Sequence, residues 1–202
     1  AEANDNSDRA VIGVFTHGAY FIGTDVRGRE NLMMDFALNP HYAEKLIDKI
    51  SQSMYAFLDE MLTNHGDGID IVYMADDYCS QHSPLFSPSD FKKFVVPYLT
   101  KVVEMTHKHG KKFLLHCCGA VRPLLPMIID AGVDMLEPIQ ISAEGMDPAG
   151  LKRDFGNDLC FYGGLDLQQV LSQATPEKVS DEVKRLIDIL GRDGGYVFGP
   201  GH

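Results

Sequence analysis

The sequence predicts an α/β fold of parallel strands. Six short apolar runs, rich in β-branched or aromatic residues, alternate with stretches of helical periodicity along the 202 residues. Polar or glycine-rich loops follow the apolar runs rather than precede them. This alternation implies parallel strands joined by right-handed crossovers, in either a doubly wound sheet or a (β/α)8 barrel.

The order of elements follows from local signals. The predicted strands are the apolar runs 11–15, 69–74, 113–116, 133–140 with its outgoing loop, 159–162 and 195–198. Helices are predicted at 29–38, 40–66, 88–110, 120–130, 148–156, 167–172 and 176–190, most of them opened by a proline or closed by a glycine. Pro97 should kink the third of these helices. The stretch 16–28 is predicted to be a loop that lines a pocket.

The chain length favours part of a barrel over a whole one. A (β/α)8 barrel takes about 250 residues and eight strands, so about six βα units in 202 residues would form an incomplete barrel. We therefore expect residues 1–202 to be one barrel domain that is truncated at both ends. Open sheet edges in such a fragment would favour either a homodimer or instability.

Composition excludes several classes of partner. A formal net charge of −11 and a pI near 5.0 argue against nucleic acid and anionic membranes, which both need a basic face. No apolar run approaches the roughly 18 residues that a membrane helix requires. Four cysteines, two of them adjacent, fit a reducing compartment, and we expect a cytoplasmic protein.

The most informative stretch is Phe113-Leu114-Leu115-His116-Cys117-Cys118-Gly119. If it is a buried strand, the side chains of His116 and Cys118 point to one face and that of Cys117 to the other. A nitrogen and a sulfur on one face suit zinc, whose catalytic sites take three protein ligands. The alternative is a buried thiol beside a hydrogen-bonded core histidine.

A third metal ligand has three candidates, Cys79, Cys160 and His202. Cys160 lies several residues before its strand ends, which is too deep for the pocket. His202 follows a Gly-Pro-Gly turn just past a strand end, where the backbone can approach closely. We therefore prefer His202, and keep Cys79 as the alternative.

Other polar residues also follow the predicted strands, where the active sites of parallel α/β folds lie. Asp76 and Asp77 are candidate catalytic acids, of which only one can point into the pocket if strand geometry persists. Glu137 is a third, either in a salt bridge or holding the imidazole of His116. The candidate substrate-binding residues are His17, Tyr78, Gln140 and Asp166. Asp166 is equally placed to cap the helix that follows it.

Several of these motifs together resemble the uroporphyrinogen decarboxylase superfamily. The matching segments are Asp76-Asp77-Tyr78-Cys79-Ser80-Gln81, Ser87-Pro88, Pro97-Tyr98, His116-Cys117-Cys118-Gly119, Gly132-Val133-Asp134, Glu137-Pro138, Gly163-Gly164-Leu165-Asp166 and Gly199-Pro200-Gly201-His202. The resemblance spans about residue 68 to the end and implies a (β/α)8 barrel.

The His-x-Cys motif at His116 and Cys118 is similar to that of the superfamily's zinc-dependent methyltransferases of the methylcobamide:coenzyme M type. That branch implies a zinc ion, a corrinoid on a partner protein, and a small methyl donor or acceptor. The family's later cysteine falls where His202 stands, and imidazole is also a zinc ligand. The other branch, which decarboxylates uroporphyrinogen without metal or cofactor, is the alternative function, with Asp76 or Asp77 stabilising the pyrrole. A third alternative is a binding module or an inactive homologue.

Overall fold

The computed structural model describes residues 8–202, and these fall into two compact units. The first contains residues 8–76, 87–115 and 130–132, and the second contains residues 77–86, 116–129 and 133–202. Six strands alternate with helices along the chain, and the paired strands run parallel. The predicted fold class, an α/β fold of the incomplete (β/α)8 type, is confirmed, and helices follow each of the first five strands in the described residues. That residues 1–202 form one barrel domain stays a prediction.

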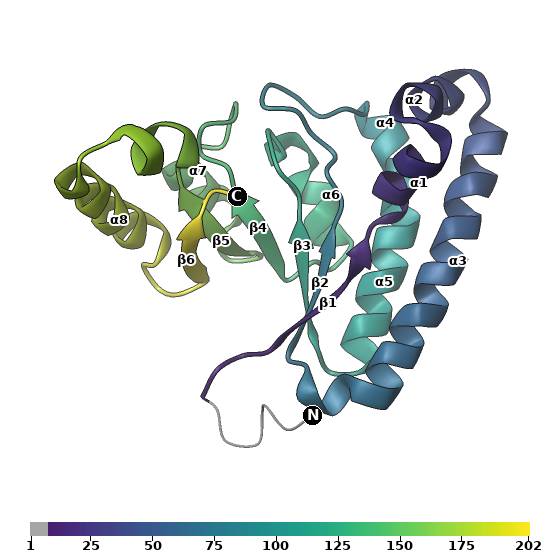
Figure 1. The fold of residues 1–202 in the computed structure, drawn as a ribbon, viewed down its shortest axis with the longest axis horizontal. Coiled ribbons are helices and arrows are strands. Elements are labelled where there is room, and N and C mark those ends of the chain that lie inside the picture. The colour runs from purple at the N-terminus through teal and green to yellow at the C-terminus, as the bar shows by residue number, and fades with distance from the viewer. Residues whose placement is uncertain (1–7) are drawn as a thin grey trace. The chain divides into compact units, whose positions relative to one another are not determined.

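The first unit holds three neighbouring strands and a layer of helices. Its strands are β1 (Ile12–His17), β2 (Ile71–Ala75) and β3 (Lys112–His116), with Ile12 opposite Ile71 and His17 opposite Ala75. The helices are α1 (Ala19–Arg27), α2 (Arg29–Leu38), α3 (Pro40–His65), α4 (Pro88–Asp90) and α5 (Val96–Lys108), with a short 3-10 turn at Gly66–Gly68. The long α3 lies beside α5 (Figure 1).

The long helix α3 forms where its sequence predicts. Pro40 occupies its first turn, and the helix closes with the Gly66 N–H donating to the Leu62 carbonyl. One face is buried at the spacing of a helical stripe, with Ala43, Ile47, Ser51, Met54, Leu58 and Leu62 inside.

The stretch 16–28 is mostly a helix rather than the predicted loop. Helix α1 begins after Gly18, which has no side chain to cap it. The missing cap comes from Asp76, whose Oδ1 accepts the N–H of Phe21, 55 residues before it, at 2.8 Å. A Cβ on Gly18 would lie 1.9 Å from the Asp76 carboxylate, so glycine is required for this approach. The local sequence therefore gives little indication that a helix forms here.

Pro97 changes the winding of its helix. The five residues Phe91–Val95 form a π-helical turn that closes with the Val96 N–H donating to the Phe91 carbonyl. Helix α5 then starts at Val96 and places Pro97 in its first turn, where no N–H is needed. The predicted disruption at Pro97 thus takes the form of a π-helical turn between two α-helical segments.

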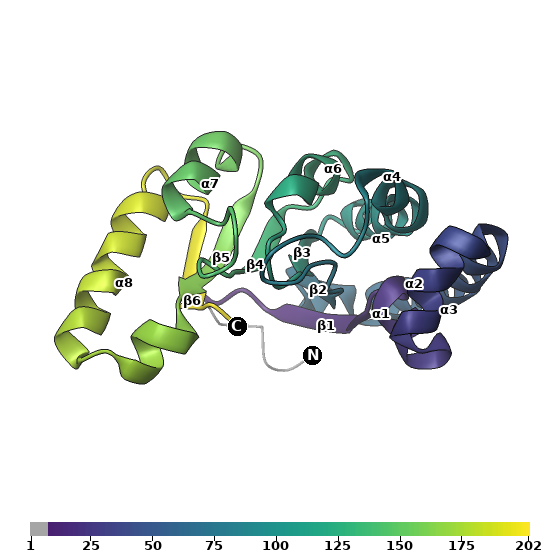
Figure 2. The ribbon, with the colours of Figure 1, turned by 90° about the horizontal axis from the view of Figure 1, so that it is seen from above.

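The second unit contains β4 (Met135–Ile139), β5 (Cys160–Leu165) and β6 (Tyr196–Pro200), side by side in this order. Met135 lies opposite Cys160, and Leu165 lies opposite Pro200. Its helices are a 3-10 turn at Arg122–Leu124, α6 (Leu125–Asp130), α7 (Pro148–Phe155), a π-helical turn at Leu167–Leu171 and α8 (Pro176–Leu190). Helix α8 packs on α7 and β5 (Figure 2).

Among the described helices, none combines the length and the apolar character that crossing a bilayer demands.

Candidate metal and substrate site

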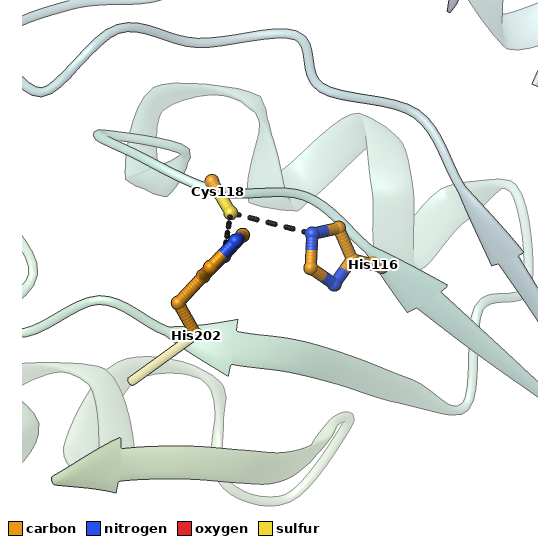
Figure 3. Close-up of side chains that lie close together, drawn as sticks. All are labelled: His116, Cys118 and His202. Carbon is orange, nitrogen blue, oxygen red and sulfur yellow. Dashed lines mark hydrogen bonds between the residues drawn. The ribbon is translucent and has the colours of Figure 1, made fainter. Parts of the chain in front are cut away.

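The side chains of His116, Cys118 and His202 converge in the second unit (Figure 3). The Cys118 Sγ lies 3.3 Å from His116 Nε2 and 3.0 Å from His202 Nδ1. All the ligand atoms of the three residues lie within 4.8 Å of one another. The sequence predicts this set, and the structure brings together two residues at the end of β3 with one that lies 84 positions later.

Strand alternation explains why His116 and Cys118 share a face. The side chains of His116 and Cys118 are both partly accessible, whereas Cys117 between them is completely buried. The Tyr78 N–H donates to the Cys117 Sγ at 3.4 Å, which makes this thiol part of the interior. Burial, above all, raises the pKa of Cys117 well above its ordinary value.

The imidazole of His116 is held by an acid. Its Nδ1 forms a hydrogen bond with Glu137 Oε2, and both side chains are largely buried. This contact leaves Nε2 facing Cys118, which is the arrangement that a metal-binding histidine commonly has. Burial opposes a charge on the ring, but the hydrogen bond and charge of Glu137, together with the charge of Asp77, raise the pKa of His116.

Asp77 fixes the backbone of Cys118, the second candidate ligand. Its Oδ1 accepts the Cys118 N–H at 2.8 Å and lies 3.8 Å from His116 Nε2. In the metal-free protein, burial and then the charges of Asp77 and Glu137 raise the pKa of the Cys118 thiol to about 12. A bound cation would supply the positive charge that this thiolate lacks.

A cavity of about 500 Å³ opens beside these residues. It is lined by Asp77, Cys79, Ser80, Gln81, Cys118, Gly119, Gln140, Ile141, Ser142, Asp166, Leu167, Gln168, Gly201 and His202. This volume lies within the range of small-molecule sites.

Of the predicted substrate-binding residues, Gln140 and Asp166 line this cavity. Gln140 Oε1 accepts the Gly119 N–H at 3.0 Å, so it also fixes the loop after Cys118. Asp166 Oδ1 accepts the N–H of Gln168 at 2.7 Å and caps the following turn, as one of its two predicted roles requires, while its role in substrate binding stays a prediction.

Three other predicted site residues lie elsewhere. The Asp76 carboxylate is buried in the first unit, where it also accepts a 2.5 Å hydrogen bond from the Tyr98 hydroxyl. His17 is exposed in the same unit and stacks on Phe21 at 4.4 Å. Tyr78 is completely buried and packs edge-on to Phe86. Asp76 and Tyr78 thus lie in the interior and are not among the residues that line the cavity, and their assignment to catalysis and substrate binding stays a prediction.

The side chains that follow β2 continue the alternation of the strand. Burial keeps alternating past the strand end, so Val72, Met74, Asp76 and Tyr78 are buried while Asp77 and Cys79 are partly open. Cys79 therefore lines the cavity beside Asp77. The strand period, continued by four residues, identifies Asp77 as the acid of the pair that reaches the cavity.

Comparisons with known proteins agree with this fold. A family model described as "Uroporphyrinogen decarboxylase (URO-D)" matches residues 10–202. A solved methyltransferase from Methanosarcina mazei superposes with a TM-score of 0.75 at 20% identity, over 98% of this chain and 54% of that one.

The proteins with similar sequences have names that describe two different activities. A methylated-thiol–coenzyme M methyltransferase of Methanosarcina mazei is 26% identical in an alignment of 184 residues that covers 89% of this chain and 47% of the relative. A uroporphyrinogen decarboxylase of Geobacter sulfurreducens is 24% identical in an alignment of 193 residues that covers 93% of this chain and 52% of the relative. The chain spans about half the length of both proteins. The match to the family model over nearly all of its residues shows that the chain belongs to the uroporphyrinogen decarboxylase (URO-D) family.

Proposed function

We propose that this chain carries the metal and substrate site of a zinc-dependent methyltransferase of the URO-D family. The observation that supports this proposal most is the convergence of two imidazoles and one thiol within 4.8 Å. This donor set suits zinc, and three protein ligands leave a fourth position for substrate. The name of the Methanosarcina relative points to the same chemistry.

The residues around the site fit this role. Glu137 holds His116 Nδ1 so that Nε2 is the free ligand atom, and Asp77 holds the Cys118 backbone. When bound, zinc would lower the pKa of a substrate thiol or polarise a methoxy oxygen. Gln140 and Asp166, which face the cavity, would orient the small methylated substrate.

The cofactor that exchanges the methyl group would be a corrinoid on a partner protein. A cavity of about 500 Å³ suits a small substrate, so we place the corrinoid outside it, presented at the mouth by the partner. We extend the proposal to a cytoplasmic protein, in keeping with four free cysteines.

Zinc analysis tests the metal site. We expect the purified protein to hold one zinc ion and the variants His116→Ala and Cys118→Ser to lose it. His82→Ala and Cys160→Ser are matched controls, because His82 is exposed and neither residue lines the cavity. A wild-type protein that binds no zinc, or equal zinc in all four variants, would contradict the proposal.

An assay of methyl transfer tests the activity. Methylated thiols and methoxy compounds would be incubated with the zinc-loaded protein and reduced cobalamin, and methylcobalamin would be followed by its absorbance. Transfer that is lost in Cys118→Ser and kept in Cys160→Ser is the expected result.

Uroporphyrinogen decarboxylation is the second candidate, because relatives with that name match at similar identity. Decarboxylation without a metal would leave the convergence of His116, Cys118 and His202 without a role, so we favour methyl transfer. Formation of coproporphyrinogen from uroporphyrinogen, unaffected by Cys118→Ser, would favour this candidate over methyl transfer.

A further inference from the structure

We infer that the thiols of Cys79 and Cys117 form a disulfide when a peroxide reaches the cavity, so that Cys79 is a site of reversible oxidation. The proposed methyl transfer uses neither thiol, and this modification goes beyond the proposed function. Two observations support it: the two thiols are in contact, and they differ in their access to solvent.

The two thiols meet although they lie on different loops of the second unit. A hydrogen bond joins the side chains of Cys79 and Cys117. The Tyr78 N–H also donates to the Cys117 sulfur at 3.4 Å, which holds this sulfur beside the backbone that leads into Cys79. The cysteines of the chain are free in this structure, so the pair is present in its reduced form.

The loops that carry the two thiols are held together by their backbones. The Ser80 carbonyl, next to Cys79, accepts the Ala120 N–H at 2.8 Å. A Cβ on Gly119 would lie 3.1 Å from the Cys79 Cβ, so the chain after Cys117 passes directly beside Cys79. A disulfide forms between cysteines that can approach without a large backbone movement. These contacts meet that requirement.

The two thiols differ in their access to a dissolved oxidant. Cys79 is partly open and lines the cavity of about 500 Å³. Cys117 is completely buried. A small oxidant in the cavity therefore meets Cys79 first, and Cys117 reacts only with the oxidised form of its neighbour.

The chemistry balances with hydrogen peroxide as the oxidant. The peroxide O–O bond breaks, one oxygen joins the Cys79 sulfur as a sulfenic acid, and the other leaves as water. The Cys117 sulfur then attacks the Cys79 sulfur, and the hydroxyl group leaves with the Cys117 proton as a second water. The two thiols have lost two electrons to the peroxide, and an added dithiol reverses the bond by thiol–disulfide exchange.

Cys118 is not part of this pair. Its Sγ lies 3.3 Å from His116 Nε2 and 3.0 Å from His202 Nδ1. Strand alternation sends the side chain of Cys117 to the other face. Oxidation of the pair therefore alters the wall of the cavity and leaves the three candidate metal ligands unmodified.

A count of free thiols tests the disulfide. The whole chain would be treated with hydrogen peroxide, and the remaining thiols would be counted after denaturation with a chromogenic thiol reagent. We expect the four thiols of the wild type to fall to two and to be restored by dithiothreitol. Cys79→Ser should keep all of its thiols. Cys160→Ser is the matched control and should lose two, because Cys160 does not line the cavity. Equal losses in the two variants would overturn the inference.

Mass spectrometry of the digested protein identifies the partner of Cys79. Because Cys117 and Cys118 are adjacent, the Cys118→Ser variant separates them, and the linked peptide should persist in it. The link should be lost in Cys117→Ala, in which dimedone should trap Cys79 as a sulfenic acid. A link that disappears in Cys118→Ser, or that joins two chains, would overturn the inference even if the buried substitution at Cys117 prevents folding.

This inference and the proposed function fail separately. A disulfide between Cys79 and Cys117 in a protein that binds no zinc would refute the metal site and leave the oxidation site standing. Zinc binding and methyl transfer in a protein that keeps its four thiols in peroxide would do the reverse.

Discussion

Single residues determine whether the candidate metal site is preorganised, and Glu137 is the clearest case. It binds His116 Nδ1 and so directs Nε2 toward Cys118. Glu137→Gln keeps the size of the side chain and removes its charge. We expect zinc affinity, measured by competition with a chelator, to fall about 10- to 100-fold.

The control for Glu137 lies in the same unit. Glu182→Gln removes an equally charged acid that pairs with Arg185 on α8. Its zinc affinity should equal that of the wild type. If the two variants bind zinc alike, Glu137 does not position His116.

Gly119 sets the close approach of two loops at the cavity. Its φ is +91°, and a Cβ there would lie 2.4 Å from the Ser80 carbonyl oxygen. Gly119→Ala should lower the free energy of unfolding by about 3 kcal/mol, because a backbone clash adds to the strain of a positive φ. Gly194→Ala, at φ +82° with nothing within 4 Å of the Cβ, should cost about 1 kcal/mol. Urea unfolding measures both, and equal losses would show that φ alone matters.

At the scale of elements, helix α1 depends on Asp76, the residue that directly follows strand β2. Asp76 accepts the Phe21 N–H and the Tyr98 hydroxyl, and it is completely buried. Asp76→Ala should therefore destabilise the protein by about 3 kcal/mol in urea unfolding, since it leaves buried donors without this acceptor. Asp70→Ala removes a carboxylate that accepts the exposed Val11 N–H and should cost less than about 1 kcal/mol. Similar losses from the two substitutions would show that Asp76 does not anchor α1.

Elements whose ends are marked by residues nearby in the sequence were predictable, and elements that depend on residues distant in the sequence were not. Pro40 and Gly66 bound α3 in the sequence and in the structure. Helix α1 was not predicted because the residue that caps it, Asp76, lies after β2 and is distant in the sequence. The π-helical turn at Phe91–Val95 was visible only as an expected disturbance at Pro97, since the sequence does not say whether a helix kinks or rewinds.

The site was predictable to the extent that strand alternation determines it. Alternation places His116 and Cys118 on one face and Cys117 on the other, as the structure has them. The same period, continued past β2, sends Asp77 toward the cavity and Tyr78 into the interior. Gln140, Asp166 and the other lining residues come from separate loops, and only the packing of the second unit decides which of them line the cavity beside Cys118 and His202.

At the scale of the molecule, zinc should stabilise the native chain by joining distant segments. His116 is the last residue of β3 and Cys118 follows the strand, whereas His202 lies 84 positions after Cys118, so the unfolded chain offers no comparable site. A ligand that binds only the folded state at a thousandfold excess over its Kd adds about 4 kcal/mol of stability. Over a chain of this size, we expect zinc to raise the Tm by about 10 °C in calorimetry.

The rise in Tm on zinc binding should depend on the imidazole of His202 and on the thiol of Cys118. In His202→Ala the shift of the Tm with zinc should shrink, because two ligands remain and both lie next to β3. In Cys118→Ser it should be abolished, whereas Cys160→Ser should keep the full shift, since Cys160 does not belong to the cluster. A shift of equal size in His202→Ala and the wild type would show that His202 does not bind the metal, and Cys79, which lines the same cavity, would then be the third ligand to test.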